Sequence, residues 1–163
     1  MLLVDTNVLV DVLENDPEWA DWSIGQLRAQ SKIYRLAINP IIYFELSLTF
    51  STVEALDKTI DDLGLVMIEM PRPALFLAGK AFVRYRRQGG TKSNVLGDFF
   101  IGAHAAVSGH PVLTRDARRY AAYFPGVKLI APDGPHAHNL ISTNFTTRRC
   151  VLHQKLVVPS ATC

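Results

Sequence analysis

Four carboxylates are the residues of this sequence best suited to chemistry: Asp5, Glu45, Asp98 and Asp116. If the fold brings them into one crevice, they cannot all stay ionised unaided, so either their pKa values rise or cations bind. A site made of oxygen ligands favours Mg²⁺ or Mn²⁺ over zinc. One or two such ions can activate a water and stabilise the charge on a phosphodiester during in-line attack. The four acids together therefore predict metal-dependent phosphodiester hydrolysis.

Each acid taken alone has a structural explanation. Asp5 and Asp116 could cap the helices that follow them, and an acid such as Asp98 in a first helical turn is favoured by the helix macrodipole. Glu45 differs, because its helical neighbours are apolar and the chain has no Lys or Arg at positions 36–57. Burying an unpaired carboxylate costs several kcal/mol, so Glu45 needs a partner.

The elements that must position these acids are short apolar runs that alternate with helical patterns, which predicts a parallel sheet covered by helices. In the strand order 3-2-1-4-5, the strand before Asp5 lies beside the strand before Asp116. Ligands of such sheets bind outside the carboxyl ends of the strands, where the order reverses. That crevice would collect Asp5, Asp98 and Asp116, and Glu45 could lean into it. We expect strands at 2–4, 36–38, 65–68, 112–114 and 127–130, and helices that begin near residue 8 and at 17–30, 40–50, 54–63, 73–88, 98–108 and 116–124.

Composition divides the chain into two parts. Its 163 residues, 48% apolar with a formal charge of +2, are enough for one domain with a sizeable core. All fifteen acids lie in residues 1–133, whereas residues 134–163 carry three bases, no acid and both cysteines. We therefore expect a domain at 1–133 and an appendage of low order at 134–163. The His and Cys residues of that appendage do not have the spacing of a standard zinc finger: His136, His138, Cys150, His153 and Cys163.

The N-terminus and the apolar runs indicate where the protein resides. The sequence begins Met-Leu-Leu-Val-Asp, which lacks the basic segment and the apolar stretch of a secretory signal. No uninterrupted apolar run reaches the roughly 18 residues that a membrane span needs. We therefore expect a soluble, cytoplasmic protein.

Four segments in order, Leu2 to Leu9, Asn39 to Glu45, Asp98 to Ala105 and Leu113 to Asp116, resemble the successive motifs of PIN-domain ribonucleases. Within that family the sequence is most similar to VapC-type toxins of bacterial toxin–antitoxin pairs. The resemblance covers residues 1 to about 132. It implies an α/β/α sandwich with a mostly parallel sheet of four or five strands. It also implies Mg²⁺ or Mn²⁺ at the acids, cleavage of structured RNA such as tRNA or rRNA, a homodimer, and inhibition by a cognate antitoxin.

The resemblance also implies roles for individual residues. Asp5, Glu45 and Asp98 would be metal ligands, and Asp116 a ligand or a partner of one. Thr114, together with Thr6 or Asn7, would orient water or a carboxylate. Two features depart from the family: Gly102 stands where alanine is usual, and the segment from Gly134 matches nothing in it.

Basic residues suggest where RNA would bind. Arg115, Arg118 and Arg119 lie beside Asp116, although Arg115 could instead pair with a neighbouring carboxylate. A helical stripe that includes Arg84 and Arg87 lies in an acid-free stretch, and it could equally be a solvated face. His104, on an apolar helix, is expected to be a packed or hydrogen-bonded side chain.

Three other functions stay open from the residues alone. One is a PIN-fold RNA-processing nuclease without an antitoxin. Another is a catalytically idle module whose acids hold a structural ion or an arginine of a partner. A phosphatase of the haloacid dehalogenase type is disfavoured, because Asp5-Thr6-Asn7 lacks the second Asp that such chemistry requires two residues on.

Overall fold

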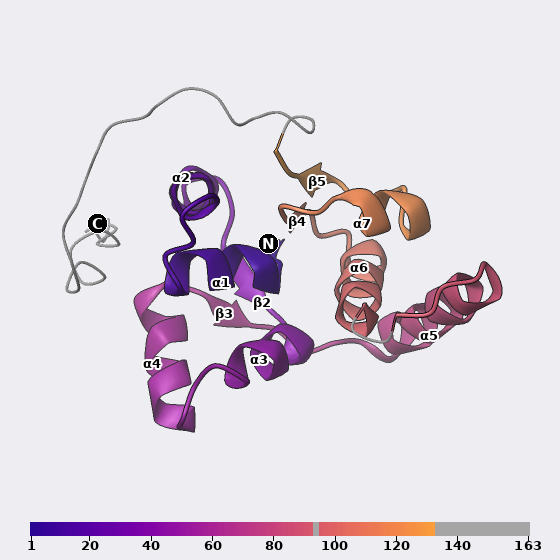
Figure 1. The fold of residues 1–163 in the computed structure, drawn as a ribbon, viewed down its shortest axis with the longest axis horizontal. Coiled ribbons are helices and arrows are strands. Elements are labelled where there is room, and N and C mark those ends of the chain that lie inside the picture. The colour runs from indigo at the N-terminus through magenta and orange to yellow at the C-terminus, as the bar shows by residue number, and fades with distance from the viewer. Residues whose placement is uncertain (93–94, 133–163) are drawn as a thin grey trace. The chain divides into compact units, whose positions relative to one another are not determined.

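Five parallel strands form the central sheet, as predicted, in the order β3-β2-β1-β4-β5, which is the order considered from the sequence (Figure 1). A computed structural model describes residues 1–92 and 95–132. The last three strands are shorter than expected, and the appendage expected at 134–163 lies outside the described residues. The strands are β1 (Leu2–Val4), β2 (Leu36–Ile38), β3 (Val66–Met67), β4 (Val112–Leu113) and β5 (Leu129–Ile130).

The centre of the sheet is fully buried. Leu2, Leu3 and Val4 have no exposed surface, and β1 pairs with β2 on one side and β4 on the other. The pairing continues one residue past β1, because the backbone N–H of Asp5 donates to the carbonyl of Leu113 at 2.9 Å. The first residues after β1 and β4 are therefore held side by side at the carboxyl edge of the sheet.

Helices cover both faces of this sheet. From β1 to β3 the chain moves in one direction across the sheet, and after β3 it crosses back to β4 and β5. Since parallel crossovers are right-handed, α1 to α4 cover one face and α5 to α7 the other, which gives the expected three-layer α/β/α sandwich (Figure 1). The described helices are α1 (Thr6–Leu13), α2 (Ala20–Ser31), α3 (Pro40–Ser47), α4 (Val53–Asp62), α5 (Arg72–Arg87), α6 (Leu96–Ser108) and α7 (Arg118–Tyr123).

Several helix ends follow from local chemistry. The side chain of Asn39 accepts hydrogen bonds from the N–H groups of Ile41 and Ile42, both at 3.0 Å, so this cap begins α3 as expected. Pro17 does not begin a helix, which corrects the expected start of α2. The carboxylate of Asp16 instead accepts from the backbone N–H groups of Glu18 and Trp19 and forms a turn before α2.

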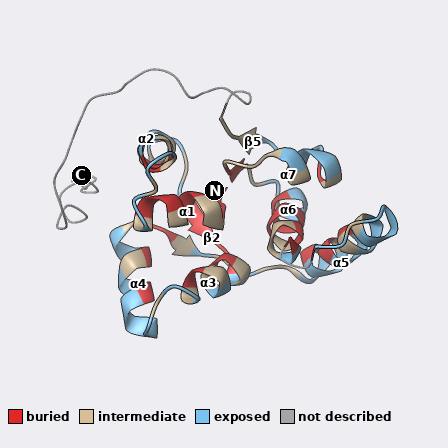
Figure 2. Cartoon of the chain, viewed as in Figure 1, coloured by how far each residue is buried: buried red, intermediate tan, exposed pale blue. Residues whose placement is uncertain are grey.

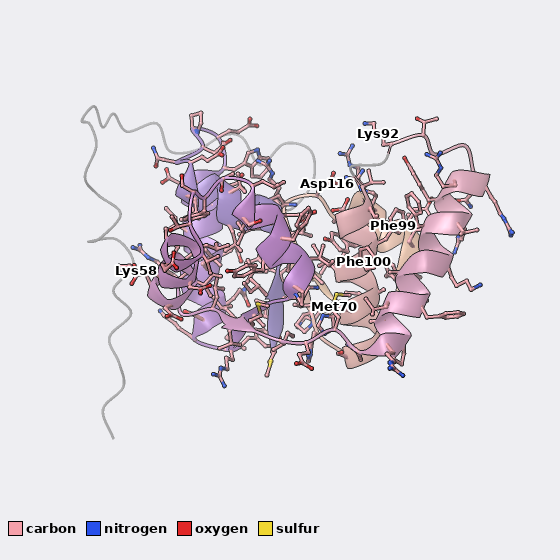
Figure 3. The ribbon with its side chains drawn as sticks, turned by 90° about the horizontal axis from the view of Figure 1, so that it is seen from below. Lys58, Met70, Lys92, Phe99, Phe100 and Asp116 are labelled. Atoms are coloured by element: carbon pink, nitrogen blue, oxygen red, sulfur yellow. The ribbon has the colours of Figure 1, made fainter. Side chains whose placement is uncertain are left out.

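The core continues into the layer made by α5, α6 and α7. Buried residues run through the middle of α6 (Figure 2), and Phe99 points from this helix toward α5 (Figure 3). The ring of Phe99 meets that of Tyr85 in α5, with their centroids 5.5 Å apart. Gly102 has a packing reason in the same layer, because a methyl group there would overlap the ring of Phe124. None of the helices in the described part of the chain is long and apolar enough to cross a membrane.

Candidate active site

Asp5 lies at the N-terminal end of α1 but does not cap it. Its carboxylate makes no capping hydrogen bond, which corrects the simplest explanation of this residue. Instead Asp5 accepts hydrogen bonds from the hydroxyl of Thr114 at 2.7 Å and from the amide of Asn7 at 2.6 Å. Thr114 follows β4, so the reversal of strand order brings together two residues 109 positions apart. The carboxylate is 3% exposed and held only by neutral donors.

Glu45 reaches the same region from α3. Its carboxylate accepts a hydrogen bond from the hydroxyl of Thr6, at the start of α1. It also lies directly against Gly97, because a methyl group built on Gly97 would overlap the Glu45 carboxylate. Gly97 is the residue before Asp98 in α6, and its lack of a side chain is what permits this close approach. In the structure without a metal ion, the partner of Glu45 is therefore the Thr6 hydroxyl.

Asp98 and Asp116 are held differently, by arginines of α7. The Nε group of Arg119 donates to the carboxylate of Asp98. Arg118 binds Asp116 with two donors, Nε and Nη2, each at 2.8 Å. Asp116 lies beside α6 (Figure 3), and it also accepts from the backbone N–H of Arg118 at 3.2 Å.

The four acids influence one another electrostatically. Burial raises the pKa of Asp5 to about 7, and the carboxylates of Asp98 and Glu45 add to this rise. Burial also raises the pKa values of Glu45 and Asp98, and the charge of Asp98 raises the pKa of Glu45 further. The pKa of Asp116 is lowered, chiefly by its hydrogen bond with Arg118. The buried Asp5 and the half-buried Glu45 and Asp98 thus lie close enough to influence one another, and Asp116 adjoins them through Asp98.

A fifth carboxylate, that of Asp11, is buried and supports the loop that carries Thr114 and Asp116. Asp11 is 1% exposed, binds Arg115 Nη1 at 2.8 Å and accepts from the hydroxyl of Ser23 at 2.9 Å. The backbone N–H of Arg115 in turn donates to the Asn7 side chain at 3.2 Å. Arg115 therefore makes the pairing with a carboxylate that the sequence left open. Sequence reasoning missed Asp11, although an acid within the apolar pattern of α1 was a signal.

The hydroxyl of Tyr120 is the other feature that sequence reasoning missed. Tyr120 is 1% exposed, and its hydroxyl lies close to the Asp5 carboxylate. Burial and the carboxylates of Asp5, Asp98 and Glu45 raise its pKa. The Tyr120 hydroxyl therefore belongs to the same polar centre as the acids.

The donors at this place suit a hard divalent cation. They are carboxylate, hydroxyl and amide oxygens, without sulfur or imidazole, and such sets prefer Mg²⁺ or Mn²⁺. Within residues 1–92 and 95–132, no three His, Cys, Asp or Glu side chains are already gathered around one point. The chemistry of the residues present thus fits the ion that the acids imply.

The other residues predicted from the sequence lie around this centre. His104 is buried within hydrogen-bond distance of Asn39, at 3.4 Å, and burial lowers its pKa, so it is the packed side chain expected. Arg84 and Arg87 are exposed on α5, and the guanidinium of Arg84 lies over the ring of Tyr123 in α7, 5.5 Å from its centroid. The histidines and cysteines considered for zinc lie outside the described residues.

With the acids in place at the carboxyl edge of the sheet, comparison with known sequences decides the family. The profile of the PIN domain matches residues 2–125. The chain belongs to the PIN domain family. PIN domains are nucleases, and the four acids fall within the matched region. No curated protein sequence matches the chain significantly.

Solved structures share this PIN fold over most of their length. A chain of VapBC2 from Rickettsia felis, bound to a promoter DNA fragment, superposes with a TM-score of 0.62 at 20% identity, over 81% of this chain and 98% of that one. A chain of DNA-bound VapBC from Salmonella typhimurium gives 0.59 at 21% identity, over 80% and 96%. A toxin–antitoxin complex from Klebsiella pneumoniae gives 0.53 at 23% identity, over 78% and 95%. At these identities the likeness establishes the fold.

Proposed function

We propose that this PIN-domain protein is a Mg²⁺- or Mn²⁺-dependent endoribonuclease and the toxin of a toxin–antitoxin pair. It hydrolyses phosphodiester bonds in structured RNA, tRNA or rRNA, in the cytoplasm. The observation that carries the proposal is the proximity of three carboxylates from separate elements at the carboxyl edge of the sheet: the buried Asp5 and the half-buried Glu45 and Asp98. Their raised pKa values are typical of a site that awaits a cation.

Each residue has a part in this proposal. Asp5, Glu45 and Asp98 would hold the metal, with Asp116 next to them. When bound, the metal supplies Lewis acidity at the phosphodiester. Thr114 and Asn7 fix the orientation of the Asp5 carboxylate, and Thr6 fixes that of Glu45, so that these ligands are positioned before any ion binds.

RNA would approach over the basic side chains next to this centre. Arg118 and Arg119 belong to α7, and Arg84 and Arg87 extend the positive charge along α5. Arginines that follow one another along a surface contact successive phosphates without reading sequence. Structured RNA suits this arrangement, because double-stranded RNA is recognised mainly by shape and by its phosphates.

Protein partners are the second part of the proposal. The structural neighbours are toxin–antitoxin complexes, which supports a cognate antitoxin for this chain. Large apolar side chains lie exposed on α3 and just after it, where Phe44 is 59% and Leu48 is 74% exposed. Exposed apolar patches of this kind mark protein interfaces, which a homodimer and an antitoxin would both require.

Cleavage of cellular RNA by the purified protein tests the proposed activity. We expect cleavage with Mn²⁺, none with EDTA, and a loss of at least about a hundredfold in Asp98→Asn. Asp61→Asn, an exposed acid on α4, is the matched control and should cleave as the wild type does. Full activity in Asp98→Asn would contradict the assignment, whereas absence of both cleavage and Mn²⁺ binding in the wild type would favour an idle binding module.

A further inference from the structure

Arg119 is placed where its positive charge meets Asp98, a half-buried acid of the candidate site. Arg119 is the second residue of α7, and its Nε group donates a hydrogen bond to the Oδ2 atom of Asp98. The pair is partly shielded, since the two side chains are 37% and 23% exposed. Arg119 also lowers the pKa of Asp98 against the effect of burial.

A carboxylate oxygen that accepts from a guanidinium is less available to a cation. Both partners are positive and seek the same negative charge, so binding of one weakens binding of the other. The inner acids have no such competitor, because Asp5 and Glu45 accept from neutral groups of Thr114, Asn7 and Thr6. Asp98 is therefore the point at which the chain's own charge opposes the entry of a metal ion.

We propose that Arg119 is an internal competitor of the divalent cation at Asp98 and a phosphate-binding residue once the cation has displaced it. The inference rests on the metal site of the proposed function. In the metal-free protein the guanidinium neutralises Asp98. When a divalent ion takes over that task, the side chain of Arg119 is released beside Asp98.

The released guanidinium is positioned to bind RNA. Its side chain is already partly exposed, and its neighbours on α7 and α5 include the exposed Arg118 and Arg84. A guanidinium can bind a phosphate with two parallel hydrogen bonds, as it can a carboxylate. The guanidinium of Arg119 exchanges Asp98 for a phosphate, and this exchange links metal binding to RNA binding. The RNA site is therefore complete only after the metal has bound. Arg119 is thus a positioning residue that sets the cation concentration at which the enzyme becomes active.

Titration of the full chain with Mn²⁺, followed by the electron paramagnetic resonance signal of the free ion, tests the competition. We expect Arg119→Ala to bind Mn²⁺ about threefold to tenfold more tightly than the wild type, because the carboxylate no longer exchanges partners. Arg119→Lys keeps the charge and should fall between them. Lys128→Ala, which removes one positive charge just before β5, is the matched control and should bind as the wild type does.

Unchanged or weaker Mn²⁺ binding in Arg119→Ala would overturn the proposal. If that variant fails to fold, as judged by thermal unfolding, Arg119→Gln retains hydrogen-bond donors without the charge and should also bind Mn²⁺ more tightly. A wild type that does not bind Mn²⁺ would instead refute the proposed function, so the two failures are distinguishable.

Cleavage kinetics at saturating Mn²⁺ test the second step. We expect Arg119→Ala to raise KM for total tRNA about threefold to tenfold, with a smaller change in kcat, because a phosphate contact is lost. An unchanged KM would show that Arg119 does not bind the substrate and would overturn that step.

Discussion

The acidic centre has an inner pair and an outer pair of carboxylates that are stabilised in different ways. The inner pair, Asp5 and Glu45, accepts hydrogen bonds from hydroxyl and amide groups that carry no charge. The outer pair, Asp98 and Asp116, is bound by two adjacent arginines of α7. Neutral donors orient a carboxylate but leave its charge in place, whereas a guanidinium cancels it. The inner pair thus keeps its negative charge, which suits binding of a cation. In the outer pair, each arginine could exchange its carboxylate for a phosphate.

The largest expected effect comes from removing the inner charge with Asp5→Asn. RNA cleavage should fall by at least about a thousandfold, because a buried ligand of the proposed ion is lost. The thermal stability of the metal-free protein should instead rise in Asp5→Asn. The pKa of Asp5 is about 7 in the folded protein, above its ordinary value of 3.8, so its ionisation destabilises the metal-free fold as pH rises from about 4 through 7.

Asp5→Asn should therefore unfold at a higher temperature than the wild type at pH 8 in EDTA, a gain of up to roughly 4 kcal/mol. The difference should vanish at about pH 3, where the wild-type carboxyl is largely protonated in both the folded and the unfolded state. Scanning calorimetry at the two pH values measures it. A variant that is less stable than the wild type at pH 8 would show that the Asp5 charge is already compensated in the metal-free protein.

A smaller effect should follow from displacing the inner pair without changing its charge. In Gly97→Ala the new methyl group overlaps the Glu45 carboxylate and must push it away from its position beside Thr6. Misplacement of a reacting group by about 1 Å can cost on the order of a hundredfold in rate, so we expect kcat to fall tenfold to a hundredfold. Gly25→Ala on α2, where a methyl group meets nothing within 4 Å, is the matched control. Equal activity in the two variants would contradict the placement of Glu45.

The smallest effect is expected at the outer pair. Arg118 is 89% exposed, and its ion pair with Asp116 is open to solvent. Exposed pairs contribute little to folding, so the melting temperature of Arg118→Ala should stay close to that of the wild type. The KM of this variant for total tRNA should rise about threefold, because one phosphate contact is lost, and the dependence of KM on salt concentration should weaken. A large drop in melting temperature would mean that the outer pair is structural.

The sequence allowed the fold to be predicted because its strands are continuous apolar runs and its turns carry recognisable residues. Asn39 before Pro40 indicated the start of α3, and the strand order 3-2-1-4-5 placed the strand before Asp5 beside the strand before Asp116. The same order brought the four acids to one edge. These predictions depend on local patterns and on the handedness of crossovers, which the sequence carries directly.

What could not be predicted depends on contacts between distant side chains. Gly97 looked like an ordinary glycine, and only the path of α3 shows that Glu45 occupies the space its side chain would take. The pairing of Arg119 with Asp98 depends on the angle at which α7 packs on α6, and nothing in a helical pattern fixes that angle. Tyr120 was not among the predicted site residues, since periodicity reports burial but not which polar group a buried hydroxyl lies near.

The pH dependence of Mn²⁺ binding tests the central claim most directly, because it asks whether the buried carboxylates are the metal ligands. Ligand carboxylates must lose their protons before an ion binds. With the pKa of Asp5 at about 7, Mn²⁺ affinity measured by calorimetry should rise by about tenfold per unit as pH increases toward 7 and level off above it. Affinity that does not change between pH 5.5 and 8.5, or that is retained in Asp5→Asn, would contradict the claim.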